Sequence, residues 1–366
     1  MNETLITLAK IAFILGLLLG FFAPILTWVE RKQSALMQDR IGANRASIMG
    51  FSFMGLLHPV ADALKMFFKE DFIPEGANRI MHTLAPIICL IPALVTFAVI
   101  PFGGIYMIGG TEISLVIADL DVGLIFVFAI SSLATYGTVI AGWASNNEWS
   151  LLGSLRAGAQ MISYEVTMGL TLVGVFMVYG SLRLTDIGAA QANVFQWGII
   201  LQPLGFLMFL TCAIAETKRA PFDVAEAESE LIAGYFLEYS GMKFGMFYMA
   251  EFLEVVTISA IVTILFFGGW HVPFMSTELI RDQILPAILG VFSKSPGDTL
   301  VNVLLMLIHV GVFWLKVIFF IWLQMTIRWT LPRFRYDQIM KLGWTILLPL
   351  SLANIVITGI VILLVG

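Results

Sequence analysis

Long apolar runs alternate with shorter polar segments along the whole chain. Eight of these runs have about the 20 residues that an α-helix needs to cross the hydrocarbon core of a bilayer. They cover residues 11–29, 84–100, 122–143, 161–179, 197–215, 244–267, 301–327 and 342–365. A helix satisfies its backbone polar groups within the segment, as lipid demands. The pattern therefore predicts an all-α integral membrane protein, a single polytopic membrane domain over residues 1–366 with eight transmembrane helices.

Four of the predicted spans contain proline, which lacks a backbone donor and crowds the preceding turn. The residues concerned are Pro86, Pro92, Pro203 and Pro349. We expect kinks or interrupted turns at these points.

The first polar segment, residues 30–80, contains a second helical pattern. Apolar residues such as Leu57, Val60 and Leu64 recur with roughly helical spacing, while Asp62 and Lys65 are polar. This pattern predicts an amphipathic helix at the membrane surface. Such a helix could be a plain membrane anchor, or it could form one wall of an entrance for an apolar ligand.

The basic residues fix an expected orientation, because Lys and Arg accumulate in cytoplasmic loops. With eight spans, one set of alternating loops contains fifteen of the 20 Lys and Arg residues. The opposite side has Lys10, Arg183, Arg281 and Lys294, and Lys316 lies within the seventh span. The split predicts both termini on the outer side, with residues 30–80 and 216–243 as cytoplasmic loops.

The composition is typical of a membrane protein, and the cysteine and histidine positions bear on which cofactor sites to expect. The chain is 59% hydrophobic and 12% charged, against about 25% charged residues in soluble domains. Cys89 and Cys212 lie in apolar spans without a CxxC pair, and the four histidines show no i, i+4 ligand pair. We therefore expect no metal site, and no nucleotide motif is evident.

Ionisable residues inside the predicted spans are candidates for function, because each costs roughly 2.5–3.5 kcal/mol to insert. They are Glu165, Glu216, Glu251, Glu254 and Lys316. Closely spaced carboxylates have raised and coupled pKa values, which lets protons redistribute among them. We interpret the acids as a proton path running toward Lys316; alternatively, each acid only stabilises helix packing.

The loop at residues 216–243 concentrates further acids. Glu226, Glu228 and Glu230 follow Asp223, in a segment that also carries Lys218 and Arg219. Glu226 and Glu230 share one helical face if the segment is helical. We expect these acids to extend the path to the cytoplasmic surface, although pairing with nearby basic residues would also explain them.

Several long motifs resemble one family, the H-type membrane subunits of NADH–quinone oxidoreductase (respiratory complex I), the counterparts of mitochondrial NADH dehydrogenase subunit one. They are "ERKQSALMQDRIGANR", "HPVADALKMFFKEDFIP", "GSLRAGAQMISYEV", "AETKRAPFDVAEAESELIAGYFLEYSG" and "LPRFRYDQIMKLGW". The resemblance covers nearly the whole chain. One departure is Ala43, where the family commonly has proline, and this affects only a local turn.

The resemblance implies a subunit at the heel of the membrane arm that forms much of a quinone chamber. The motifs place around this chamber Glu30, Arg31, Asp62, Lys65, Glu70, Arg219 and Asp223. It implies quinone as substrate, with flavin and iron–sulfur clusters in partner subunits and no redox centre in this chain. The expected partners are the other complex I subunits and membrane lipids, not nucleic acid, and the expected location is the bacterial cytoplasmic membrane.

Other functions remain open from the sequence. The corresponding subunit of a membrane-bound hydrogenase, or of another donor–quinone reductase, resembles this chain in plan. A stand-alone secondary transporter often shows an inverted repeat, and no internal repeat is evident here. A purely structural anchor would leave the buried acids without a role.

Overall fold

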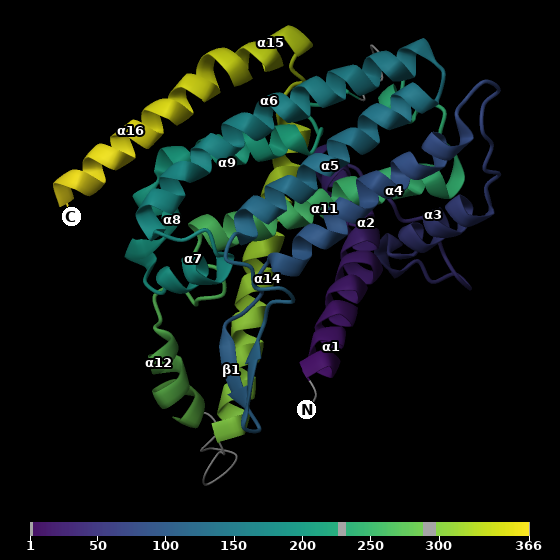
Figure 1. Ribbon diagram of the computed structural model, residues 1–366. Helices are drawn as coiled ribbons and strands as arrows, with labels where there is room; N and C mark the ends of the chain where they lie inside the picture. The colour runs from purple at the N-terminus through teal and green to yellow at the C-terminus, as the bar shows by residue number, and fades with distance from the viewer. Residues whose placement is uncertain (1–2, 226–231, 288–297, 366) are drawn as a thin grey trace.

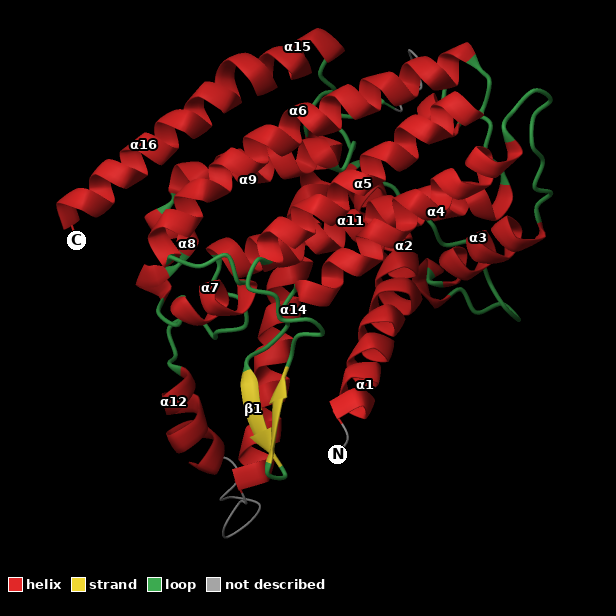
Figure 2. Cartoon of the chain, in the orientation of Figure 1, coloured by secondary structure: helices red, strands yellow, loops and turns green. Residues whose placement is uncertain are grey.

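The computed structural model describes residues 3–225, 232–287 and 298–365, and nearly all of its regular structure is helical (Figures 1 and 2). Glu226, Glu228 and Glu230 lie outside the described residues. The first half contains α1 (Glu3–Leu15), a π-helical segment (Gly16–Phe22), α2 (Ala23–Met37), α3 (Leu57–Phe68), α4 (Arg79–Val95), α5 (Gly123–Ala144) and α6 (Glu148–Tyr179). The second half contains α7 (Leu184–Ala190), α8 (Gly198–Leu201), α9 (Pro203–Glu216), α11 (Gly241–Phe266), α12 (Thr277–Leu279), α14 (Asp298–Thr330), α15 (Tyr336–Lys341) and α16 (Leu348–Val365).

Among the described residues, seven helical stretches are long and apolar enough to cross a membrane. They are Thr4–Met37, Arg79–Val99, Gly123–Ala144, Glu148–Tyr179, Gly241–Phe266, Asp298–Thr330 and Tyr336–Leu364. They coincide with seven of the eight predicted spans. The remaining prediction, a continuous helix over residues 197–215, differs from the structure, where α9 is a shorter apolar helix of 14 residues.

The break in this span has a local cause. Gln202 adopts φ −136° and ψ 59°, outside the helical region, and Pro203 begins α9. The side chain of Gln202 is buried, where it accepts a hydrogen bond from Asn354 Nδ2 (3.0 Å) and donates one to Thr358 Oγ1 (2.7 Å). These bonds join the interrupted span to α16 and give the polar Gln202 amide partners within the bundle.

Replacing Asn354 with Leu is expected to destabilise the protein by about 0.6–2 kcal/mol, the usual range for an interhelical hydrogen bond in a membrane. The change removes the donor to Gln202 Oε1 within a buried site. The free energy of unfolding, measured by titration with a denaturing detergent, checks this. Val356→Leu, at an exposed position of the same helix, is the control, and equal stability of the two variants would contradict the prediction.

The core of the bundle is α11, which is almost entirely buried and packs against α4 and α14. Around it, α4 lies along α5, and α5 lies along α6. Glycine allows these close approaches, since a Cβ on Gly137 would lie 2.4 Å from Cys89 Sγ and one on Gly142 would lie 2.3 Å from Ser154 Oγ. Small residues let membrane helices approach closely and gain van der Waals contacts.

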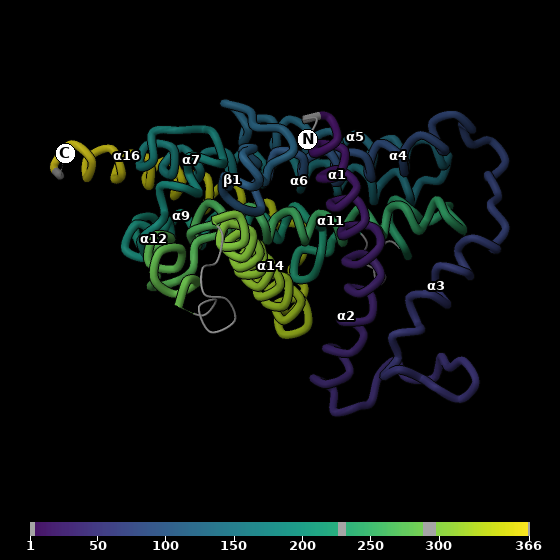
Figure 3. The backbone as a smooth tube through the Cα atoms, turned by 90° about the horizontal axis from the view of Figure 1, so that it is seen from below, coloured from purple at the N-terminus to yellow at the C-terminus, as the bar shows by residue number. Residues whose placement is uncertain are grey.

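The amphipathic pattern in the first polar segment does form a helix, α3. It projects beside the bundle in Figure 3, in contact with α2 and α11. Its apolar residues Val60, Leu64, Phe67 and Phe68 are exposed. This is the arrangement expected of a helix whose apolar face meets lipid or another apolar partner.

One hairpin, which was not predicted from the sequence, occurs among the described residues. Strands β1 (Ile105–Ile108) and β2 (Thr111–Ser114) pair antiparallel, with Ile108 opposite Thr111. Gly109 and Gly110 form the turn with φ of +59° and +77°, the left-handed values that a two-residue hairpin turn requires. The hairpin contacts the beginning of α14.

Candidate functional site

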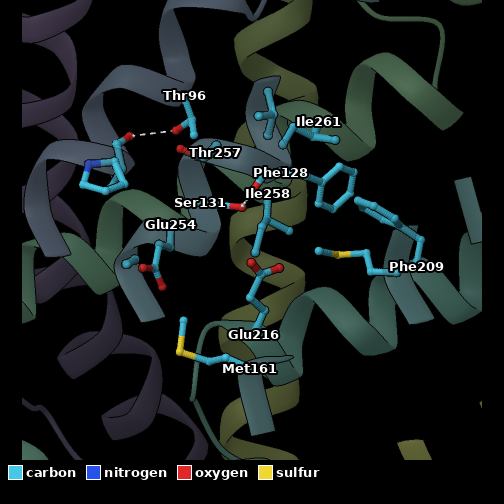
Figure 4. Close-up of a pocket in the computed structure, with 15 residues that line it drawn as sticks. Thr96, Phe128, Ser131, Met161, Phe209, Glu216, Glu254, Thr257, Ile258 and Ile261 are labelled. Atoms are coloured by element: carbon cyan, nitrogen blue, oxygen red, sulfur yellow. Dashed lines mark hydrogen bonds between the residues drawn. The ribbon is translucent and has the colours of Figure 1, made fainter. Parts of the chain in front are cut away.

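A cavity of about 50 Å³ lies inside the bundle between α4, α5, α6, α9 and α11 (Figure 4). Its wall is mostly apolar, with residues such as Met161, Phe209 and Ile258. Two acids also line it, Glu216 at the end of α9 and Glu254 on α11. We call this space the carboxylate cavity.

Two polar atoms that line the carboxylate cavity are not satisfied by protein. Among the described residues, Glu254 Oε2 and Thr257 Oγ1 are buried and have no hydrogen-bond partner. Ser131, from α5, also lines the space. Buried polar groups without protein partners are typical positions for bound water when the space is large enough.

The structure brings four of the predicted acids into one group. Glu216 lies within electrostatic range of Glu165 and Glu254, and Glu254 lies within range of Glu251. Glu251 is buried and accepts a hydrogen bond from Tyr235 Oη (3.0 Å). Glu165, Glu216, Glu251 and Glu254 therefore form one group of interacting carboxyls.

Lys316 lies apart from this group. Its ammonium donates to three carbonyls beyond the end of α11, those of Phe267 (2.8 Å), Gly269 (3.0 Å) and His271 (2.7 Å). Phe267 follows Glu254 by 13 residues, or about 20 Å along a helix. A cation is favourable at this position because a helix ends in unpaired carbonyls with partial negative charge.

A buried ion cluster lies where α2, the segment after α9, and α14 meet. Glu30 binds Arg219 (3.2 Å) and Arg328 (2.7 Å) through its two carboxylate oxygens. Arg219 also stacks over the ring of Phe252, 4.1 Å from its centroid. The side chains of Glu30 and Arg219 are each only 7% exposed, so the charges compensate one another rather than being screened by water.

The predicted residues near the surface helix also meet. Asp62 binds Arg31 (2.6 Å) and Lys65 (2.8 Å), which ties α3 to α2. Burial alone would raise the pKa of Asp62, but Lys65 and Arg31 together hold it below its usual value. Glu70 takes part through its backbone carbonyl, which accepts a hydrogen bond from Ser240 Oγ (3.1 Å).

Asp223, in the loop after α9, pairs with Arg333 (2.7 Å). Burial raises the pKa of this carboxyl, and the guanidinium of Arg333 opposes part of the rise. The pair ties the acidic loop to the segment that follows α14.

Sequence reasoning missed several residues of this region. Arg328 was counted only as a basic residue near a loop, and Tyr235 was not singled out. Lys218, considered only as a countercharge, is 3% exposed and lies 5.3 Å from the ring centroid of Tyr235. The available signal was the position of Lys218 and Tyr235 within the same acidic motif, but a motif does not reveal which of its side chains are buried.

Comparisons with known proteins identify the family of this chain. A family model described as NADH dehydrogenase matches residues 9–359. A relative from Geobacter metallireducens, named as H subunit 1 of NADH-quinone oxidoreductase, is 46% identical over 359 residues, covering 98% of this chain and 97% of the relative. The protein of the same name from Cytophaga hutchinsonii is 43% identical over 364 residues, covering 100% and 97%. The chain therefore belongs to the NADH dehydrogenase family.

Proposed function

We propose that this chain is a membrane subunit of an NADH–quinone oxidoreductase, and that it links quinone reduction to proton translocation. The observation that carries the proposal is the carboxylate cavity, where Glu216 and Glu254 line one space inside a membrane bundle. The relatives named as H subunits of NADH–quinone oxidoreductase support it. The electron-transferring flavin and iron–sulfur clusters would belong to partner subunits of the hydrophilic arm.

The quinone chamber is proposed to lie at the junction of α2, α3 and the loop after α9. The exposed apolar face of α3 suits the isoprenoid tail of a quinone or the lipid around it. The buried ion cluster of Glu30, Arg219 and Arg328 would form a polar boundary deeper in the chain. Arg31, Asp62, Lys65, Glu70 and Asp223 would hold the surrounding segments in place.

The buried acids are proposed to transmit the change in charge and protonation that quinone reduction causes. Reduction of a quinone consumes protons and changes the local charge. In a low-dielectric interior a single charge change acts strongly on its neighbours, and closely spaced carboxylates share protons. Glu251 would respond first, through its bond with Tyr235, and Glu254 and Glu216 would follow along the cavity. Glu165, Glu226, Glu228 and Glu230 would connect this group to the cytoplasmic surface.

The topology is part of the proposal. Counting α8 and α9 together as an interrupted span gives eight crossings, α3 lies at the interface, and both termini face the outer side of a bacterial cytoplasmic membrane. The strongly uneven distribution of Lys and Arg supports this orientation. In this arrangement Lys316 stabilises the outer end of α11 and lies beyond the acids of the proposed path.

Purification of this chain from its native membranes tests the function. We expect it to co-purify with a flavin- and iron–sulfur-containing assembly that reduces quinone with NADH in an inhibitor-sensitive reaction. Nickel and hydrogen-linked activity would move the chain to the hydrogenase branch. A protein that purifies alone, without cofactors, would contradict the proposal and favour a transporter.

A further inference from the structure

A second cavity lies beyond the C-terminal end of α11. It is lined by the β1–β2 hairpin, residues 183–189, the segment after α11, and the first half of α14, and its volume is about 460 Å³. Figures 1 and 2 show these elements gathered around the lower part of α14. We call this space the outer cavity; none of the acids of the carboxylate cavity lines it.

Two histidines line the outer cavity. His309 on α14 is 2% exposed, and His271 in the segment after α11 is 9% exposed. Their ring centroids are 6.1 Å apart, with the rings inclined at 66°. In both rings Nε2 is buried and has no hydrogen-bond partner in the part of the chain that the structure describes.

Each ring is oriented through its other nitrogen. Tyr106 Oη lies 2.6 Å from His309 Nδ1, and Thr277 Oγ1 lies 3.3 Å from His271 Nδ1. Tyr106 Oη also accepts a hydrogen bond from the backbone N–H of Gly104 (3.1 Å). This is the arrangement of metal-binding histidines, in which a hydrogen bond at one nitrogen fixes the ring and leaves the other nitrogen for the ion.

The spacing of the two rings suits a single ion between them. A Zn–N bond is about 2.0–2.1 Å, which places the ion about 3 Å from the centroid of each ring it binds. Two such rings have centroids separated by about 5–6 Å, depending on the N–Zn–N angle.

The charged residues that line the outer cavity balance in formal charge. Asp119 pairs with Arg183, and Asp186 and Arg281 also line the cavity. The ammonium of Lys316 would oppose a cation at His271, but it binds three carbonyls beyond the end of α11, which offset part of its charge.

We propose that His271 and His309 form a binding site for a divalent transition-metal ion of the Zn²⁺ or Cu²⁺ type, with Tyr106 and Thr277 as positioning residues. Imidazole nitrogen is a preferred ligand of both ions. A bound ion would fix the segment after α11 to α14 and would close the floor of the outer cavity. The site is independent of the proposed role in quinone reduction.

Titration of the purified, oxidised, fully assembled complex with Cu²⁺, followed by electron paramagnetic resonance, tests the site. We expect one copper species with couplings to two imidazole nitrogens, which Zn²⁺ displaces. His271→Gln and His309→Gln should each abolish it, and Tyr106→Phe should weaken copper binding about 10- to 100-fold.

His58→Gln is the matched control, since His58 accepts a hydrogen bond from the backbone N–H of Ala46, far from the outer cavity in sequence. It should leave the copper species unchanged. NADH–quinone reduction by each variant verifies that the complex is assembled. Absence of a two-nitrogen species in the wild type, or its survival in both His271→Gln and His309→Gln, would overturn the proposal.

Discussion

Replacing Glu254 with Gln is expected to reduce proton translocation coupled to quinone reduction by about 10²-fold or more, the usual size of a lost proton-transfer group. Glutamine has nearly the same shape but cannot release or accept a proton at this position. Glu254 lines the carboxylate cavity, and its Oε2 has no protein partner among the described residues. Glu216→Gln, on the facing helix, should have an effect of similar size.

The measurement is proton uptake by membrane vesicles, followed with a pH-sensitive dye while NADH reduces quinone. If both acids serve one path, the double variant should be little worse than either single variant, because residues that act as a unit are not additive. Glu148→Gln, at an exposed position at the start of α6, is the control and should keep full activity. Normal pumping by both single variants would exclude these acids from the path.

The largest expected loss of stability follows from replacing Glu30 with Gln. This change leaves Arg219 and Arg328 near each other without the carboxylate that binds both. Removing one partner of a buried ion pair typically costs about 3–5 kcal/mol, because the remaining charge loses its counterion in a poorly hydrated site. The free energy of unfolding in a denaturing-detergent titration, and the amount of assembled complex in membranes, should both fall.

Two further variants separate charge burial from loss of packing. Glu30→Met combined with Arg219→Met should recover part of the stability that Glu30→Gln loses, because fewer uncompensated charges remain. Arg335→Met breaks an exposed pair with Asp337, whose side chains are 72% and 68% exposed, and should cost less than about 1 kcal/mol. If Glu30→Gln and Arg335→Met lowered the free energy of unfolding by the same small amount, the ion cluster would not stabilise the fold as described.

The helical architecture could be predicted from the sequence because the bilayer imposes one length and one backbone conformation on each span. Seven predicted spans correspond to membrane-length helices. The interruption at Gln202 and Pro203 was predictable only as a disturbance near a proline. The extent of the interruption depends on Asn354 and Thr358 in α16. These residues are distant in sequence, and they form hydrogen bonds with the side-chain amide of Gln202.

Residue spacing also predicted part of the candidate site. Glu251 and Glu254 are three positions apart on one helix, so their proximity follows from helical geometry. Periodicity does not encode how separate helices pack. The proximity of Glu216 to Glu254 and the ion pair between Glu30 and Arg328 both depend on that packing. The hairpin has a local signal that was overlooked, the Gly109–Gly110 pair between two short apolar stretches.

The partners of Lys316 could not be predicted from the charge pattern. A cation near the middle of a span was interpreted as the end point of the acidic path, and this stays a prediction. Its three carbonyl partners lie in the segment that follows α11. The chain-reversing glycines Gly268 and Gly269, with φ of +70° and +50°, are the local sign of the end of α11.

We expect the buried acids to change protonation when quinone is reduced. Infrared difference spectroscopy of the purified complex, recorded as quinone is reduced, observes carboxyl groups directly. We expect bands of protonated carboxyl groups that respond to reduction in the wild type and that are altered or lost in Glu216→Gln and Glu254→Gln. Identical difference spectra for the wild type and both variants would contradict it.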